Sequence, residues 1–189
     1  GRVSLLHAPV NVVPLQSAVP AVVTIHDLVF MVMPDRYLPA KRRYLEAFTR
    51  LTVRVARHVI ADSEHTRQDV IRLLDVPPDR VSAVPLGVIE HFRPPDPVAL
   101  EDFRARYGLP ERYLLYLGTL EPRKNLGTLL RAYAALRRRG LDWPLVLAGG
   151  KGWLYEDIFR TIAALDLAPH VRLPGYVSYE EQPLWYGAA

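Results

Sequence analysis

The chain has 189 residues, 50% of them hydrophobic, no cysteine and a formal net charge of +4 that comes mainly from arginine. This composition permits a buried core and excludes disulfides, thiolate metal sites and a cysteine nucleophile. No apolar segment approaches the ~18–20 residues that span a bilayer, and the first residues do not resemble a secretion signal, so we expect a soluble, cytoplasmic protein. The charge favours anionic partners, but no zinc-finger, RNA-binding or helix-turn-helix pattern accompanies it, and we expect no nucleic-acid partner.

Short segments rich in valine, leucine and isoleucine alternate with helical stretches, which is typical of parallel βαβ units with buried strands. The expected strands are Val3–Leu6, Pro20–Ile25, His58–Ala61, Val81–Pro85, Tyr113–Leu117, Leu145–Ala148 and Val171–Leu173. The expected helices are Ala40–Arg57, a helix capped by Ser63 that ends before Pro77, Val98–Tyr107, Asn125–Arg139, Trp153–Leu165 and Glu180–Ala189. The sequence therefore predicts an α/β fold.

A proline-rich segment, Pro85–Pro97, separates two such regions and is unsuited to a central strand or a helix. After it, the pattern β-α-β-α-β matches one nucleotide-binding half of a doubly wound sheet. We predict that residues 1–92 form the C-terminal part of one domain. Residues 93–109 would be a linker with a connecting helix, and 110–189 the first part of a second domain.

The helix Ala40–Arg57 has two stripes at helical spacing. The apolar stripe comprises Tyr44, Phe48, Leu51 and Val55, and the basic stripe comprises Arg43, Arg50, Arg54 and Arg57, which project within ~60° of each other. A basic stripe is commonly a solvated face, and it can also contact anionic lipid. Both interpretations stay open, and the second adds possible peripheral contact with the inner membrane face.

The segment from Tyr116 to Asn125 combines a strand that ends at Gly118 with two cations, Arg123 and Lys124, just before a helix. Ligands of open α/β sheets bind outside the carboxyl ends of strands, and helix N-termini attract phosphate. Arginine and lysine together suit a diphosphate leaving group. The segment is therefore either a phosphate site or a solvated turn with two surface cations.

Four motifs resemble, in order and separation, those of the family-4 glycosyltransferases, also described as group 1. They are Thr24–Leu28, Ala61–Thr66, Val84–Val88 and Leu117–Asn125. The resemblance covers nearly the whole chain and implies the GT-B fold, with two Rossmann-like, doubly wound parallel-sheet domains, both incomplete in this chain. The first would be the acceptor domain and the second the nucleotide-sugar domain.

The resemblance also implies site residues. Arg123 and Lys124 would bind the donor diphosphate, with Gly118 leaving room for it. His26 follows a strand and would act as the catalytic histidine near the reacting sugar, although a structural role at the strand end is the alternative. The neighbouring Asp27 is interpreted as a turn residue.

Further positions at strand ends are candidates with structural alternatives. Gly149, Gly175, Tyr176 and Val177 would line the donor or nucleobase cleft, where a plain strand-to-helix turn is the alternative. His7 and Ser63 could line the acceptor cleft, although His7 suits a structural role and Ser63 suits a helix cap.

The expected activity is retaining transfer of a sugar, with mannose one candidate, from a nucleoside diphosphate to an acceptor hydroxyl in glycan, lipid or polysaccharide synthesis. We expect no metal and no cofactor, since Arg123 and Lys124 would offset the diphosphate charge. The family's paired glutamates are expected beyond residue 189, so we expect no turnover by this chain alone. The alternatives are a GT-B nucleotide-sugar 2-epimerase and a non-catalytic nucleotide-binding module.

Overall fold

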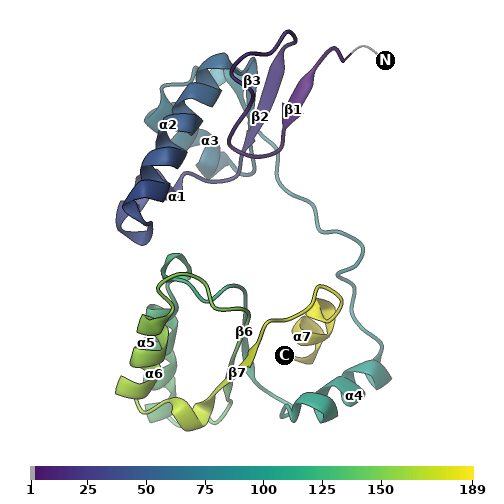
Figure 1. Ribbon diagram of the computed structural model, residues 1–189. Coiled ribbons are helices and arrows are strands. Elements are labelled where there is room, and N and C mark those ends of the chain that lie inside the picture. The colour runs from purple at the N-terminus through teal and green to yellow at the C-terminus, as the bar shows by residue number, and fades with distance from the viewer. Residues whose placement is uncertain (1–2) are drawn as a thin grey trace. The chain divides into compact units, whose positions relative to one another are not determined.

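The computed structural model describes residues 3–189, and its internal contacts divide the chain into two units (Figure 1). The first unit ends at Gly87 and the second begins at Val88. Residues 84–96 contain no helix or strand, as the proline-rich sequence predicts.

The first unit is built on a sheet of four parallel strands in the order β1-β2-β3-β4. The strands are β1 Leu6–Ala8, β2 Ala21–Ile25, β3 His58–Ala61 and β4 Val81–Ala83. The helices are α1 Val29–Val32, α2 Pro39–Val55 and α3 Glu64–Leu74, with short 3-10 turns η1 Pro34–Arg36 and η2 Pro78–Arg80. Because sequential strands are neighbours and such crossovers are right-handed, α2 and α3 lie on the same face of the sheet (Figure 1).

Local sequence explains how α3 begins and ends. The Ser63 hydroxyl accepts a hydrogen bond from the Thr66 backbone N–H at 3.1 Å, which confirms Ser63 as the N-cap. The helix ends at Leu74, because the next residue, Asp75, adopts a left-handed conformation with φ of 54°.

Helix α2 does not bury the apolar stripe that its periodicity predicts. Tyr44, Leu51 and Val55 are 53%, 39% and 47% exposed. The buried residues of α2 are Thr49, Thr52 and Val53. These compact β-branched side chains let the helix approach its neighbours closely, and the Thr52 hydroxyl accepts a hydrogen bond from the Val13 backbone N–H at 3.2 Å. The apolar stripe identified by spacing is therefore not the buried face of this helix.

The second unit has a parallel sheet in the order β5-β6-β7. Its strands are β5 Leu114–Leu117, β6 Leu145–Ala148 and β7 Val171–Gly175. Its helices are α4 Pro97–Tyr107, α5 Leu126–Arg138, α6 Glu156–Ala164 and α7 Gln182–Ala188, with 3-10 turns η3 Pro122–Lys124 and η4 Ala168–His170. Helix α4, predicted as a connection, packs against α7 within this unit.

Strand β6 is buried on both faces, as a continuous apolar run predicts. Leu145 and Leu147 point into a core with α5 and α6, whereas Val146 and Ala148 point into a second core with α4 and α7. This alternation follows from the two-residue period of a strand. Helices consequently cover both faces of the sheet (Figure 1).

Four element boundaries differ from the expectations in ways that affect the candidate sites. Strand β7 runs to Gly175, so this residue ends the strand instead of following it. Strand β1 covers Leu6–Ala8 rather than Val3–Leu6, so His7 lies within the strand instead of after it. Helix α6 begins at Glu156, because the positive φ of Leu154 (53°) interrupts the predicted helix. Arg123 and Lys124 lie in η3, and the left-handed Asn125 separates this turn from α5.

Candidate functional site

Three loops follow the carboxyl ends of β5, β6 and β7, and backbone hydrogen bonds join them. Gly118 N–H donates to the Ala148 carbonyl at 2.9 Å, and Gly149 N–H donates to the Gly175 carbonyl at 2.7 Å. Further out, Leu120 N–H donates to the Gly150 carbonyl at 2.9 Å. The loops therefore form one continuous surface at the edge where open α/β sheets bind ligands.

Gly149 is required by this close packing. Its φ is +147°, and a Cβ atom there would lie 2.0 Å from the Gly118 carbonyl oxygen. Gly118 itself has a φ of +156°, and an added Cβ atom would lie 3.0 Å from the Tyr116 hydroxyl. The two glycines thus let adjacent loops approach each other more closely than side chains would allow.

The side chain of Tyr116 covers the start of the first loop. Its hydroxyl donates to the Thr119 carbonyl at 2.9 Å, and burial raises the pKa of the Tyr116 phenol. The phenol therefore stays neutral, and its hydrogen bond holds the backbone just before η3, the turn that carries Arg123 and Lys124.

Arg123 is held by a buried carboxylate that the sequence analysis missed. Glu121 is 2% exposed, and its Oε1 atom accepts a hydrogen bond from Arg123 Nε at 2.9 Å and lies 2.8 Å from Nη2 in the same ion pair. The pair orients the guanidinium and offsets part of its charge. Arg123 therefore offers a directed hydrogen-bonding group rather than a full unit of positive charge.

Lys124 differs from its neighbour because it is exposed and its ammonium group makes no hydrogen bond or ion pair with any of residues 3–189. The nearby Lys151 instead lies over aromatic rings of α6 and its N-terminus, 4.9 Å from the centroid of Tyr155 and 5.2 Å from that of Phe159. Lys124 consequently supplies the accessible positive charge of the loop Gly118–Asn125.

Of the residues at the end of β7 that were predicted to contact the nucleobase, one has an exposed side chain and another is buried. Gly175 has a φ of +87°, and the next residue, Tyr176, is 81% exposed. Val177 is buried in the core with Phe103 and Trp185. Of the predicted nucleobase contacts, only Tyr176 thus offers an exposed side chain, and Val177 can contribute only its backbone.

In the first unit, His26 pairs with Asp62, a residue that the sequence analysis did not select. His26 Nδ1 donates to Asp62 Oδ2 at 2.6 Å, and Nε2 donates to the Pro9 carbonyl at 2.8 Å. Both partners are acceptors, so both ring nitrogens carry protons in this arrangement. The hydrogen bond to Asp62 raises the pKa of His26, against a smaller opposing effect of burial. The raised pKa widens the pH range over which His26 carries a positive charge.

The strand register explains this pair. Ile25 of β2 lies opposite Ala61 of β3, so His26 and Asp62 are the first residues beyond two neighbouring strands. Because parallel strands end at the same edge of a sheet, the two sequence motifs place His26 and Asp62 at one edge. They do not give the strand register, and without it the contact between these two side chains could not be predicted.

The remaining candidates of the first unit have structural partners. His7 Nε2 lies 3.0 Å from the Thr24 hydroxyl across β1 and β2, so it does not follow a strand end as predicted. Asp27 accepts a hydrogen bond from the Val29 N–H at 3.1 Å, which confirms it as a turn residue. Ser63 caps α3, whose Thr66 hydroxyl also donates to the His26 carbonyl at 3.3 Å. Ser63 and His26 are therefore linked by Thr66, which makes a hydrogen bond with each of them.

Two negative findings apply to residues 3–189. No group of three or more His, Cys, Asp or Glu side chains is arranged to hold a metal ion. Within the same residues, no helix is both long and apolar enough to cross a bilayer.

Sequence profiles of two related families match the chain. The profile described as Glycosyltransferase Family 4 matches residues 3–92, and that described as Glycosyl transferases group 1 matches residues 101–189. The chain is 31% identical over 171 residues to O-antigen chain mannosyltransferase B of Escherichia coli, covering 89% of this chain and 45% of the relative.

A second relative is the GDP-mannose-dependent alpha-(1-6)-phosphatidylinositol monomannoside mannosyltransferase of Mycolicibacterium smegmatis. It is 36% identical over 114 residues, which cover 56% of this chain and 30% of the relative. The chain thus spans less than half the length of the curated relatives it matches.

Among solved structures, HepE from Anabaena in complex with UDP-glucose superimposes with a TM-score of 0.71 at 19% sequence identity. The match covers 90% of this chain and 45% of that chain. At this level of identity the likeness shows the fold, which is that of the GT-B glycosyltransferases with Rossmann-like parallel sheets.

Proposed function

This chain belongs to glycosyltransferase family 4, and from that premise we propose that its parent protein transfers a sugar from a nucleoside diphosphate to an acceptor hydroxyl with retention of configuration. The observation that carries the proposal is the cationic loop at the carboxyl edge of the second sheet. There Arg123 is oriented by Glu121, and Lys124 is exposed without a partner among residues 3–189.

The donor diphosphate would lie against this loop. The guanidinium of Arg123 offers a planar set of donors to phosphate oxygens, and Lys124 offers a compact charge. Both interactions strengthen as negative charge develops on the departing diphosphate, which is the condition for stabilising a transition state. In this proposal the two side chains supply the charge that a metal ion provides elsewhere, so neither a metal nor a cofactor is needed.

His26 would contact the reacting sugar as a hydrogen-bond donor. Because its Nδ1 faces the Asp62 carboxylate and its Nε2 faces a carbonyl oxygen, the imidazole is arranged as a donor, and in this proposal it stabilises a sugar oxygen rather than acting as a general base. Its Nε2 proton is directed at the Pro9 carbonyl, and a substrate oxygen would take the place of that acceptor.

Mannose is the sugar that the relatives favour, because both curated relatives named above are mannosyltransferases. The nucleotide base stays open, since contacts from arginine and lysine to phosphate do not depend on it. The acceptor would be a hydroxyl of a glycan or of a lipid-linked glycan.

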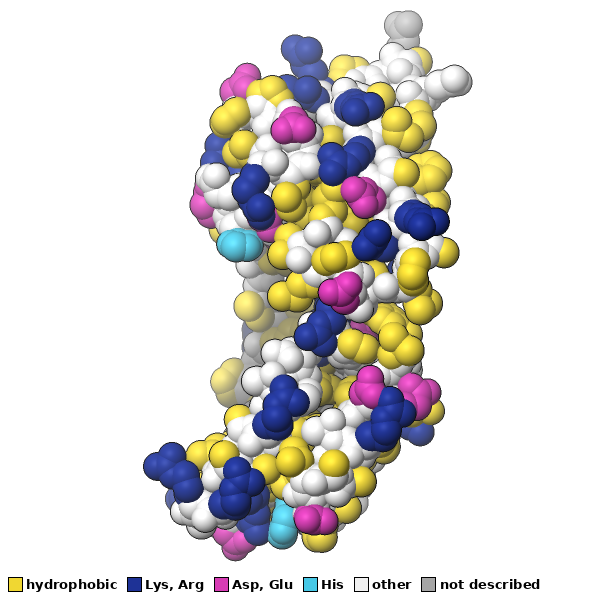
Figure 2. All heavy atoms as spheres, turned by 90° about the vertical axis from the view of Figure 1, so that its left-hand side faces the viewer, with side chains coloured by type: hydrophobic (Ala, Val, Ile, Leu, Met, Phe, Trp, Pro, Cys, Tyr) yellow, Lys and Arg dark blue, Asp and Glu magenta, His cyan; other side chains and the backbone are white. Residues whose placement is uncertain are grey.

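We also propose peripheral contact with a membrane, because α2 exposes apolar and basic residues together. Tyr44, Leu51 and Val55 are exposed, and the guanidinium groups of Arg43 and Arg54 make no hydrogen bond or ion pair with any described residue. The view onto the side of the molecule that carries α2 shows hydrophobic and Lys/Arg side chains interspersed (Figure 2). Arg50 contributes less, since its Nη1 donates to the Leu73 carbonyl at 3.0 Å.

Calorimetric titration with GDP-mannose, UDP-glucose and inorganic pyrophosphate tests the donor site. A glycosyltransferase should bind one nucleotide sugar more tightly than the other and more tightly than pyrophosphate. Equal affinity for all three would favour a phosphate-binding module. Conversion of a nucleotide sugar to its 2-epimer without an acceptor would indicate the epimerase.

A further inference from the structure

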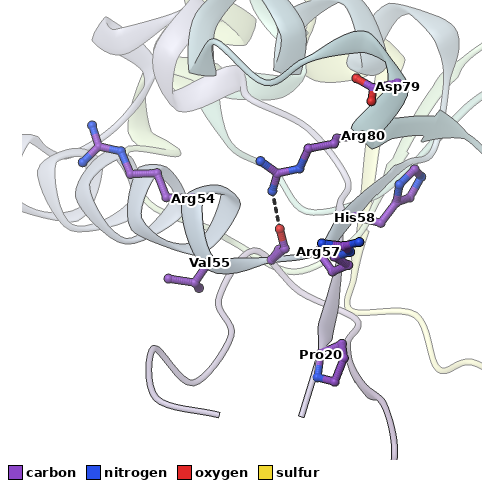
Figure 3. A pocket seen from close by; sticks show the side chains of 8 residues that line it. Pro20, Arg54, Val55, Arg57, His58, Asp79 and Arg80 are labelled. Carbon is purple, nitrogen blue, oxygen red and sulfur yellow. Dashed lines mark hydrogen bonds between the residues drawn. The ribbon is translucent and has the colours of Figure 1, made fainter. Parts of the chain in front are cut away.

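A pocket of about 910 Å³ opens in the first unit, away from its candidate site (Figure 3). It is lined by Pro20, Arg54, Val55, Ala56, Arg57, His58, Asp79 and Arg80. These residues come from the end of α2, the starts of β2 and β3, and the turn η2. Three of the eight are arginines. Arg54 and Val55 also belong to the face of α2 proposed to contact a membrane, whereas the other six lining residues have no role in the proposed function.

The pocket lies at the amino end of the parallel sheet. Pro20 directly precedes β2 and His58 begins β3, whereas His26 and Asp62 follow the carboxyl ends of the same strands. A strand of five residues spans roughly 15 Å, at ~3.3 Å per residue. The pocket is therefore separate from the proposed acceptor site.

Arg80 is fixed in the wall of this pocket. Its Nη2 donates to the carbonyls of Ala56 and of Val53, the latter at 3.2 Å, and so satisfies the C-terminal end of α2 (Figure 3). This contact also offsets the negative end of the helix dipole, which would otherwise repel an anion.

Arg54 and Arg57 are the cations available to a ligand. Both are exposed, and neither guanidinium makes a hydrogen bond or ion pair with any of residues 3–189. Asp79 is the one acidic residue in the lining, against three arginines. Three like charges around one hollow repel each other, and a bound anion would remove that repulsion.

We propose that this pocket binds a phosphate group, held by the guanidinium group of Arg57 with Arg80 adding positive charge from the wall, and that Arg54, whose guanidinium points away from these two in Figure 3, turns toward the bound anion. The planar fork of arginine matches two phosphate oxygens at once. The same chemistry is found in a free phosphate anion and in the headgroup of an anionic phospholipid. The site is independent of the donor loop, because it lies in the other unit of the chain.

The test is a titration followed by backbone amide NMR of the 189-residue chain at constant ionic strength. One arm adds inorganic phosphate. The other compares vesicles of phosphatidylcholine with vesicles of equal parts phosphatidylcholine and phosphatidylglycerol. The amides of Arg57 and His58 report on the pocket, and that of Lys124 reports separately on the donor loop.

The variant is Arg54→Ala/Arg57→Ala, which leaves Arg80 in place to stabilise the end of α2. The matched control, Arg138→Ala/Arg139→Ala, removes two exposed arginines from the second unit. Loss of two charge-assisted contacts should weaken the affinity of the variant for the bound probe by about tenfold or more. The control should bind this probe with the affinity of the unmodified chain.

A response of Arg57 and His58 to inorganic phosphate that the variant loses supports the pocket and a soluble ligand. Binding only to the phosphatidylglycerol vesicles supports the pocket and a lipid headgroup if the variant loses this binding and Arg43→Ala, which removes a basic residue of α2 outside the pocket, keeps it. Equal loss in Arg43→Ala would indicate the exposed face of α2 instead and would overturn the pocket. The proposal is overturned if neither probe perturbs these amides. It is also overturned if the variant binds like the unmodified chain, or if the control loses binding equally, because bulk charge would then explain the effect.

Discussion

The Oε1 atom of Glu121 accepts a hydrogen bond from Nε of Arg123 at 2.9 Å and lies 2.8 Å from Nη2 of the same guanidinium in an ion pair. Glu121 is almost completely buried, so this carboxylate is a fixed part of the fold. The candidate donor loop therefore contains an arginine whose orientation is set before any ligand arrives. Preorganised donors of this kind need no rearrangement when negative charge develops.

We expect Glu121→Gln to weaken binding of the preferred nucleotide sugar by about tenfold, since a neutral amide holds the guanidinium less firmly. Calorimetric titration measures the affinity, and urea unfolding shows whether the variant is folded. The matched change is Glu156→Gln, which removes a carboxylate from the exposed start of α6. Unchanged affinity in Glu121→Gln would show that Glu121 does not position Arg123 for the donor.

Arg123→Ala should lower the free energy of unfolding by roughly 1–3 kcal/mol, because it leaves the buried Glu121 carboxylate without this partner. The double variant Glu121→Gln/Arg123→Ala removes the unpaired charge and should recover part of that loss. Urea denaturation of both variants gives the comparison. Equal stability of the two would indicate that Glu121 finds other partners.

We expect Gly149→Ala to destabilise the second unit by roughly 3 kcal/mol or more, because its Cβ atom would lie 2.0 Å from the Gly118 carbonyl oxygen at a strained φ of +147°. Gly150→Ala is the matched control, since nothing lies within 4 Å of an added Cβ atom there. In thermal unfolding, Gly149→Ala should have a clearly lower melting temperature than Gly150→Ala. Similar melting temperatures would contradict the close approach of the two loops.

The raised pKa of His26 gives a pH dependence with a definite sign. A raised pKa means that the folded state favours the proton, so the stabilising effect of the pair is complete below the ordinary histidine pKa of ~6.5. It is lost as pH rises through the higher folded value. NMR titration of the His26 ring should show this raised pKa, and Asp62→Asn should lower it.

The Asp62→Asn variant isolates the effect of the carboxylate, because Asp62 Oδ2 lies 2.6 Å from His26 Nδ1. If the His26 pKa does not fall in this variant, Asp62 is not the cause of the raised value.

We expect Leu51→Asn to reduce binding to vesicles that contain phosphatidylglycerol while changing the free energy of unfolding by less than about 1 kcal/mol, because Leu51 is 39% exposed on α2. Vesicle co-sedimentation and urea unfolding measure the two effects. Leu136→Asn is the matched control, since Leu136 is 42% exposed on α5. Equal vesicle binding by both variants would reject α2 as the membrane-contacting helix.

Sequence periodicity predicted the strands well because burial on both faces leaves a strong apolar signal, as at Leu145–Ala148. Periodicity did not identify which face of α2 is buried. Tyr44, Leu51 and Val55 have the spacing of a core face, but Thr49 and Thr52 pack there instead. Spacing identifies a stripe, whereas the partner surface decides which stripe is buried.

The sequence predicted which loops form the candidate sites, but not the side-chain contacts within them. Gly118, Arg123 and Lys124 could be identified from their motif and their place after a strand. The role of Glu121 could not, because sequence does not show that a charged residue next to a proline is 2% exposed. Asp62 was similarly missed, since its contact with His26 depends on the register of two strands 36 residues apart in sequence.

Lys124→Ala tests the central claim most directly, because Lys124 is exposed and its ammonium group has no partner among residues 3–189 whose loss could disturb the fold. The measurement is calorimetric titration of the preferred nucleotide sugar into this variant, with Lys151→Ala as the comparison. Loss of one charge-assisted contact predicts binding about tenfold weaker or more in Lys124→Ala and a smaller change in Lys151→Ala. Unchanged affinity in a folded Lys124→Ala protein would contradict the assignment of Gly118–Asn125 as the donor diphosphate site.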